Sequence, residues 1–180
     1  MDLIFSIPDS ISKFLLLDPI DFLIVPAELI DFLRVIMSDP LVLDLDGDGI
    51  ELIDLGSSTT IFDLDDDAFA ERVGWVSPHD GLLVHDSSGN GLVDGIGELF
   101  GSAEVDGFDE LATLDANADG RIDAFDPSFD ELLVWRDLNA DGVSTPDEML
   151  TLVQAGITRF DLDFNQVDEK AGGNVVARTG

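Results

Sequence analysis

The chain has 180 residues, of which 45% are hydrophobic, and its 39 acidic and 8 basic residues give a formal net charge of −31 at pH 7. That much apolar sequence can form a packed core, whereas the negative field excludes binding to nucleic acid or to an anionic membrane surface. With no cysteine and only two histidines, disulfides and thiolate metal sites are excluded, and the remaining ligands are oxygen atoms, which suit hard cations such as Ca²⁺.

Residues 1–38 form an apolar leader that is rich in Leu, Ile and Phe. Its apolar residues recur at helical spacing after Pro26, which predicts a helix over residues 27–37. We therefore expect a mostly helical segment that is the end of a preceding region. Carboxylates interrupt the segment too often for a membrane span, at Asp18, Asp21, Glu28 and Asp31.

From residue 40 onward, short apolar runs alternate with Asp/Gly turns. "LVLDL", "TIFDLD", "GWVS" and "GLLVHD" predict strands, and so does the alternating "RFDLDF" near the end. Helical spacing returns after residue 107 in "FDELATL", "PSFDELLVW" and "PDEMLTLVQAG". We expect residues 40–180 to form one module.

Residues 137–148, here called loop V, match the twelve-residue calcium loop of the EF-hand. In such a loop, side-chain oxygens at positions 1, 3 and 5 and a carbonyl at position 7 converge on one ion, glycine at position 6 makes the turn, and a carboxylate at position 12 completes the shell. The sequence "DLNADGVSTPDE" has all these features. The predicted ligands are the side chains of Asp137, Asn139, Asp141 and Glu148 and the carbonyl of Val143.

Residues 115–126, or loop IV, follow the same rule with aspartate at position 12. The predicted ligands are Asp115, Asn117, Asp119, Asp123 and Asp126 and the carbonyl of Arg121. Helical patterns flank both loops, so we predict a paired EF-hand-like helix–loop–helix–loop–helix unit. The predicted fold class is therefore α+β, with short strands and Asp/Gly calcium loops followed by this unit.

Three upstream loops match the rule less closely, and each is read either as a calcium loop or as an acidic β-turn. Loop I (44–55) has leucine at position 12, loop II (63–71) has alanine at position 6, and loop III (86–98) has its glutamate one place late. A ligand from another segment could complete any of them. The candidate ligands are Asp44, Asp46 and Asp48 in loop I, Asp63, Asp65 and Asp67 in loop II, and Asp86, Ser88, Asn90, Asp94 and Glu98 in loop III.

Four blocks of the chain occur in the order found in a known family: "DPLVLDLDGDGIEL", "GWVSPHDGLLVHDSSGNGLVDGIGELFG", "LDANADGRIDAFDPSFDELLVWRDLNADGVS" and "LVQAGITRFDLDF". From residue 39 to about residue 165 the chain resembles the self-processing module of iron-regulated RTX proteins. The resemblance implies secretion by a type I route and calcium-triggered cleavage of the Asp39–Pro40 bond. It also implies transfer of the freed aspartyl end to a lysine amine as an isopeptide cross-link. Since Lys13 and Lys170 are the only lysines of the chain, a lysine-bearing acceptor protein is favoured.

The chain departs from the family pattern at three places. Ala68 stands where the pattern favours glycine, and Ser88 where it favours asparagine. The chain also stops before the strand that follows "GNVVARTG" in the family, which predicts a module truncated at its C-terminus.

The chemistry of Asp39 and Pro40 agrees with this resemblance. An aspartate carboxyl can attack its own backbone carbonyl to close a cyclic anhydride, and the proline nitrogen is a good leaving group once protonated. Calcium would act mainly by folding the module, or by polarising the scissile carbonyl. The alternative function is a non-catalytic, calcium-stabilised structural or docking module of a secreted RTX adhesin or toxin.

Overall fold

The computed structural model describes residues 2–5, 40–64, 66–102, 105–163, 165–171 and 174–179. The helix predicted over 27–37, the catalytic candidate Asp39 and the loop II candidate Asp65 lie outside these ranges. In the part of the chain that is described, no helix is both long enough and apolar enough to cross a membrane.

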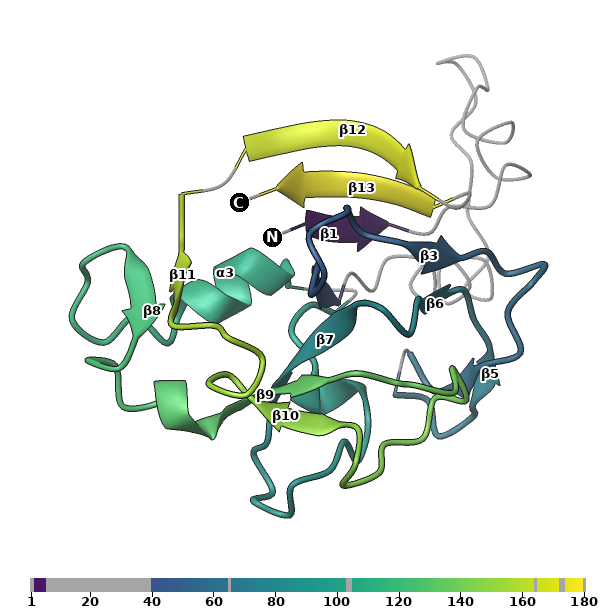
Figure 1. The fold of residues 1–180 in the computed structure, drawn as a ribbon, viewed down its shortest axis with the longest axis horizontal. Coiled ribbons are helices and arrows are strands. Elements are labelled where there is room, and N and C mark those ends of the chain that lie inside the picture. Colours follow the sequence, from purple (N-terminus) through teal and green to yellow (C-terminus); the bar gives the residue numbers. More distant parts are fainter. Residues whose placement is uncertain are drawn as a thin grey trace, which may run out of the picture.

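A seven-stranded antiparallel sheet runs through the molecule (Figure 1). Strands from the two ends of the chain form one edge of it, and strands from the middle form the other. Their order is β10 (Met149–Thr151), β9 (Leu132–Trp135), β7 (Gly81–His85), β2 (Leu41–Leu43), β1 (Asp2–Phe5), β13 (Asn174–Thr179) and β12 (Asn165–Ala171).

Three two-stranded ribbons and a few helical turns complete the described fold. The ribbons pair β3 (Leu52–Ile53) with β6 (Trp75–Val76), β4 (Ile61–Phe62) with β5 (Glu71–Arg72), and β8 (Arg121–Asp123) with β11 (Arg159–Asp161). The helical elements are α3 (Gly107–Ala112) and the 3₁₀ turns η1 (Ile96–Glu98) and η2 (Phe129–Glu131).

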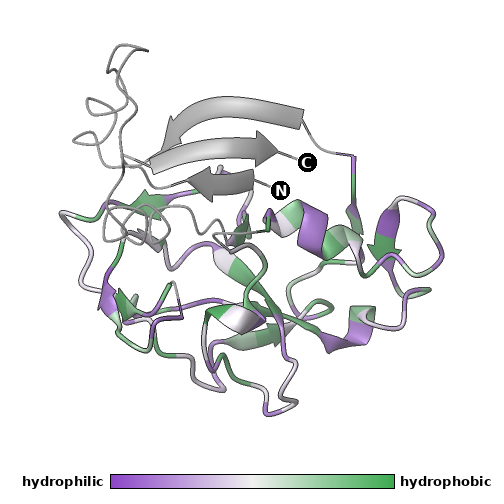
Figure 2. Ribbon diagram, turned by 180° about the vertical axis from the view of Figure 1, so that it is seen from behind, coloured by the Kyte–Doolittle hydropathy of each residue, from purple (hydrophilic) through white to green (hydrophobic). Residues whose placement is uncertain are grey.

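The central strands β2, β7 and β9 are buried on both faces of the sheet. In β2, Leu41 and Leu43 pack into one apolar cluster, whereas Val42 packs into the other. The first cluster also contains α3 residues, and the second contains both tryptophans. Figure 2 shows apolar sequence concentrated in the middle of the molecule and hydrophilic stretches in the surrounding loops. Burial on both faces explains why these strands are continuous apolar runs.

The predicted α+β class is wrong. Among the described residues the structure consists mostly of strands in small antiparallel sheets, with one short α-helix and two 3₁₀ turns, and there is no paired helix–loop–helix unit. Only "FDELATL" of the three helical patterns forms an α-helix, which Asp106 caps by accepting hydrogen bonds from two backbone N–H groups.

The segments on either side of loop V are strands for a physical reason. Phe129, Leu132 and Leu133 are spaced as on a helix, but the run 132–135 also alternates between the two apolar clusters. Alternation fits a strand that is buried on both faces. Thus β9 enters loop V, β10 leaves it, and the two pair antiparallel with Trp135 opposite Met149.

Candidate metal-binding loops

All five predicted loops have the same backbone turn. In each loop the carboxylate at position 1 accepts a hydrogen bond from the backbone N–H at position 6. The N–O distances are 3.0 Å in loop I, 2.9 Å in loop II, 2.8 Å in loop III, 2.9 Å in loop IV and 2.8 Å in loop V. This bond curls the loop around its first aspartate, so that alternate side chains come to the same side.

The residues at positions 4 and 6 of each loop adopt positive φ. At position 6, glycine has this conformation in four loops, and Ala68 takes it in loop II with a φ of 68°. At position 4, Ala118 in loop IV and Ala140 in loop V also have positive φ, although alanine disfavours it. The turn is therefore imposed even where the local sequence opposes it.

In each of loops III, IV and V, a buried carboxylate connects the start of the loop to position 9 by hydrogen bonds. Glu98, Asp126 and Glu148 are only 6%, 3% and 5% exposed. Each accepts one N–H from the start of its loop and one from position 9. In loop V the donors are Leu138 (3.0 Å) and Thr145 (3.1 Å), in loop IV Ala116 (2.9 Å) and Asp123 (3.0 Å), and in loop III Ser88 (3.0 Å) and Asp94 (2.9 Å).

Hydrogen bonds also bring pairs of predicted side chains together in loops III and V, whereas only loop I brings three carboxylates of the described residues within 4.8 Å of one another. Asn139 donates to Asp141 at 2.9 Å, Asn90 donates to Asp94 at 2.9 Å, and Ser88 donates to Asp86 at 3.3 Å. The donors available to a metal are carboxylate, amide, hydroxyl and carbonyl oxygens, a set that fits Ca²⁺. We therefore take the residues present to be chemically suited to the ion that the spacing predicts.

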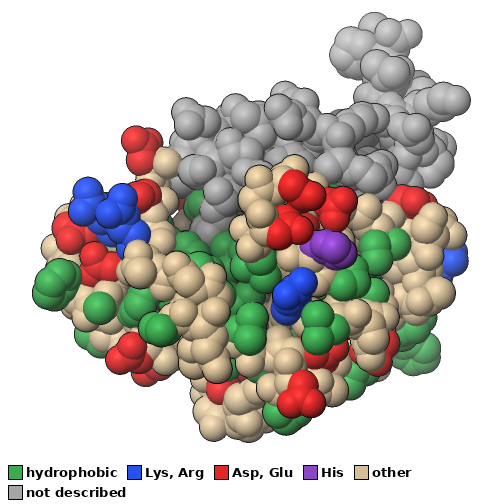
Figure 3. Space-filling model, in the orientation of Figure 1, with side chains coloured by type: hydrophobic (Ala, Val, Ile, Leu, Met, Phe, Trp, Pro, Cys, Tyr) green, Lys and Arg blue, Asp and Glu red, His purple; other side chains and the backbone are tan. Residues whose placement is uncertain are grey.

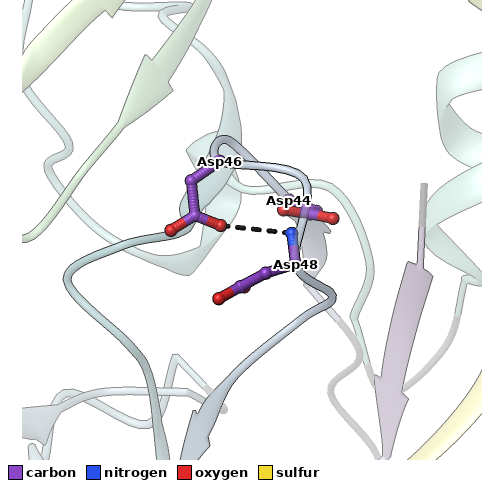
Figure 4. Close-up of side chains that lie close together, drawn as sticks. All are labelled: Asp44, Asp46 and Asp48. Carbon is purple, nitrogen blue, oxygen red and sulfur yellow. Dashed lines mark hydrogen bonds between the residues drawn. The ribbon is translucent and has the colours of Figure 1, made fainter.

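Loop I holds the three carboxylates Asp44, Asp46 and Asp48, whose oxygens lie within 4.8 Å of one another (Figure 4). A side-chain hydrogen bond between Asp46 and Asp48 lowers the pKa of Asp46 and raises the pKa of Asp48. Such a pair retains a proton more readily than an isolated aspartate, and a divalent cation would relieve the repulsion.

Charge compensation from cationic side chains is sparse on these loops. Figure 3 shows acidic side chains gathered beside a histidine on one face. Among the described residues, Asp46 is the only side chain predicted as a ligand that pairs with a basic side chain. Its Oδ2 lies 3.4 Å from Nδ1 of the exposed His79. The guanidinium of Arg121, by contrast, pairs with Asp161 at 3.2 Å.

The loops are paired differently from the prediction. We expected loops IV and V to share a helix, but η2 and β9 lie between them. Loop III instead contacts loop V through Ser144, whose Oγ accepts from the N–H of Val93 at 2.8 Å and donates to its carbonyl at 3.3 Å. Both residues occupy position 8 of their loops, so this contact ties the middle of one loop to the middle of the other.

Residues outside the predicted set also support the loops. The indole Nε1 of Trp75 donates to Oδ2 of the fully buried Asp137 at 2.8 Å, and Oγ1 of Thr60 donates to the carbonyl of Ala140 at 2.6 Å. Neither contact has a local sequence signal, because each joins residues more than sixty positions apart. Asp80 is a third such residue, because its Oδ2 accepts the N–H of Glu51 in loop I at 2.7 Å.

The fold and the loops thus define the class of protein: an antiparallel β module built around five acidic loops. The SPM domain family model matches residues 41–180, and the chain belongs to this family.

In an alignment 152 residues long that covers 79% of this chain, the sequence is 44% identical to the iron-regulated protein FrpA of Neisseria meningitidis serogroup C. The chain spans only 14% of the length of that relative. The predicted relation to iron-regulated proteins is confirmed at this level.

Proposed function

We propose that the chain is a calcium-triggered self-cleaving module that breaks the Asp39–Pro40 bond. The observation that carries the proposal is the anchoring of Pro40 beside β2, all three residues of which are buried. Leu41 follows it directly, is fully buried, and donates its N–H to the carbonyl of Phe100 at 3.1 Å. One side of the scissile bond is therefore attached to a rigid strand, which favours a fixed geometry for intramolecular attack.

The proposed reaction begins when a carboxyl oxygen of Asp39 attacks its own backbone carbonyl carbon. A carbon–oxygen bond forms, the bond to the Pro40 nitrogen breaks, and the carboxyl proton passes to that nitrogen. The product is a five-membered cyclic anhydride and a free prolyl amine. Water opens the anhydride to a C-terminal aspartate, whereas a lysine amine opens it to an amide. Orientation of this kind lowers a barrier by up to about 7–11 kcal/mol.

Calcium would act by ordering the strands on which Pro40 depends. Strand β7 pairs with β2 and runs directly into loop III, and β9 pairs with β7 and runs into loop V. Calcium bound at these loops would neutralise the carboxylates that oppose compaction and so favour the sheet. The secretion that the family resemblance implies suits this trigger, because the module would then meet calcium outside the cell.

The test is to incubate the whole chain with calcium or with chelator and to read intact masses under denaturing conditions. We expect fragments 1–39 and 40–180 with calcium alone, and none from the Asp39→Ala variant. Asp18→Ala, which alters another Asp-Pro bond, is the matched control and should cleave like the wild type. An uncut chain that nevertheless binds calcium would overturn the proposal.

A second candidate is a non-catalytic, calcium-stabilised docking module. Exposed apolar side chains on the loops favour it, since Phe69 of loop II and Phe125 of loop IV are 77% and 82% exposed. Such side chains are the usual anchors of protein contacts. Calcium binding without cleavage, together with capture of a specific protein that Phe125→Ser abolishes, would favour this function.

A further inference from the structure

A chain of two hydrogen bonds connects a carboxylate of α3 to Leu41, the residue that follows Pro40. Leu41 donates its N–H to the carbonyl of Phe100 at 3.1 Å, and Gly101 donates its N–H to Oε2 of Glu110 at 2.9 Å. The Phe100 carbonyl and the Gly101 N–H belong to the same planar peptide unit. One peptide plane therefore lies between Leu41 on one side and Glu110 on the other.

The segment 99–101, which contains this peptide plane, is held by the core. Leu99 forms an antiparallel bridge with Val84 of β7, and both Leu99 and Phe100 are almost fully buried. Gly101 has a φ of 95°, which glycine adopts at no steric cost, and in this conformation its N–H reaches Glu110. The peptide plane is thus fixed at both ends of the segment.

Helix α3 also packs directly against the residues that this chain joins. A Cβ on Gly107, its first residue, would lie 3.0 Å from Cγ of Leu41 and 3.2 Å from the carbonyl oxygen of Phe100. The side chain of Phe108 is fully buried in the same apolar cluster as Leu41. Packing therefore fixes α3, and the carboxylate of Glu110 with it, relative to Leu41.

A carboxylate acceptor strengthens both hydrogen bonds of the chain. A hydrogen bond to a charged acceptor is roughly twice as strong as one between neutral groups. It also polarises the peptide plane, so that the Phe100 carbonyl accepts more strongly from Leu41. Because the Leu41 N–H shares a peptide unit with the Pro40 carbonyl, the chain ends on the residue whose nitrogen is the leaving group in the proposed reaction.

We propose that Glu110 is a positioning residue for cleavage of the Asp39–Pro40 bond. Its carboxylate holds the peptide plane of Phe100 and Gly101, that plane holds the Leu41 N–H, and Pro40 is thereby kept in one backbone conformation. Glu110 acts through these two hydrogen bonds and not at the reacting atoms. The inference rests on the proposed self-cleavage and assigns a role to a side chain outside the acidic loops.

The test compares cleavage rates of whole chains at saturating calcium, where a change in calcium affinity has no effect. Glu110→Ala removes the acceptor, and we expect it to slow cleavage by roughly tenfold or more. Glu110→Gln keeps a neutral acceptor and should cleave at a rate between those of Glu110→Ala and the wild type. The matched control is Asp109→Ala, which removes an exposed carboxylate of the same helix and should leave the rate unchanged.

Amide proton signals of the uncut Asp39→Ala chain distinguish positioning from a loss of stability. In Glu110→Gln the Gly101 amide proton should shift upfield, and the Leu41 amide proton should shift with it, because the weaker bond is transmitted through the peptide plane. A folded module that is only less stable would show neither shift. A Leu41 signal that stays in place would overturn the inference.

The rates provide two further ways to overturn it, namely a wild-type rate in Glu110→Ala or equal slowing by Asp109→Ala. If Glu110→Ala does not fold in calcium, Glu110→Gln decides the matter, and a wild-type rate in that variant would overturn the inference.

The two proposals fail in distinguishable ways. A wild-type chain that binds calcium and stays uncut contradicts self-cleavage, whatever the Leu41 signal does in Glu110→Gln. A wild-type chain that cleaves no faster than a folded Glu110→Ala chain contradicts this inference alone.

Discussion

At the scale of single residues, the two tryptophans differ in one hydrogen bond. Trp75 and Trp135 pack edge to face with ring centroids 5.5 Å apart, and both contact Phe62. Trp75 donates to Asp137, whereas the buried Nε1 of Trp135 has no partner among the described residues. The first indole therefore fixes the position-1 carboxylate of loop V, and the second contributes packing alone.

Replacing Trp75 by phenylalanine should weaken calcium binding at loop V. A hydrogen bond to a charged group contributes about 1.5–3 kcal/mol, so we expect the calcium midpoint to rise by roughly tenfold or more. Calcium titration followed by circular dichroism measures the midpoint. Trp135→Phe removes a similar volume without breaking that bond and should shift the midpoint less. Equal shifts for the two variants would contradict this role of Trp75.

Ala68 is a residue at which the effect of backbone strain can be tested by substitution. It holds position 6 of loop II with a φ of 68°, a conformation that costs an alanine about 1–2 kcal/mol. Ala68→Gly should therefore increase the free energy of unfolding by about 1 kcal/mol. Urea unfolding of the uncleavable Asp39→Ala chain in calcium measures it. Ala124→Gly, at an exposed residue without positive φ, should be neutral or destabilising, and the prediction fails if both changes act alike.

At the scale of elements, loop V packs against the β4 segment at its position-6 glycine, whereas loop IV is open at the same position. A Cβ on Gly142 would lie 2.8 Å from both the Ile61 carbonyl oxygen and a Thr60 methyl group. A Cβ on Gly120, at the equivalent position of loop IV, would meet nothing within 4 Å. Gly142 is needed both for its positive φ and because a side chain would not fit, whereas Gly120 is needed for its positive φ alone.

Alanine substitutions at Gly120 and Gly142 should thus separate the cost of steric overlap from the cost of backbone strain. Gly120→Ala should cost only the backbone strain of about 1 kcal/mol, whereas Gly142→Ala should cost a further 1–3 kcal/mol, roughly, because backbone must move. Unfolding in urea at saturating calcium gives both values. A Gly142→Ala chain as stable as Gly120→Ala would show that loop V does not depend on its contact with β4.

The sequence predicted the loops better than the elements between them. Alternating oxygens are a local rule, as is the glycine at position 6 that four of the loops have, so the turns could be located from spacing, including loop II with its alanine. Phe129, Leu132 and Leu133 satisfy a helical pattern, but burial on both faces of a sheet, which only the folded chain defines, makes the run 132–135 a strand. The contact of Asp80 with Glu51 could not be predicted from spacing, because it depends on the β2–β7 register.

At the scale of the whole molecule, the net charge opposes folding, and bound cations would offset it. A net charge of −31 on 180 residues repels itself, and the few cationic side chains described offset little of it. The shared loop turns are suited to bind cations directly through specific oxygen atoms, and not only to have their charge screened by salt.

Removing calcium should accordingly unfold the module. We expect the Asp39→Ala chain in chelator to lose its near-ultraviolet circular dichroism and to recover it with calcium, but not with ~1 M NaCl, which only screens. Asp137→Ala/Asp141→Ala should impair calcium-induced folding and, in a cleavable background, cleavage as well. Cleavage that persists in this variant without folding would contradict the role given to calcium.

The position of β1 determines what would happen to the leader if the proposed cleavage took place. Residues 2–5 lie in the sheet between β2 and β13, with Leu3 opposite Leu41 on one side and opposite Arg178 on the other. A break after residue 39 severs the covalent link but leaves these backbone hydrogen bonds intact. The two pieces would then behave as a nicked complex that co-elutes in native buffer and separates only in denaturant. Processing would change the chemistry of the chain end before it releases any part of the molecule.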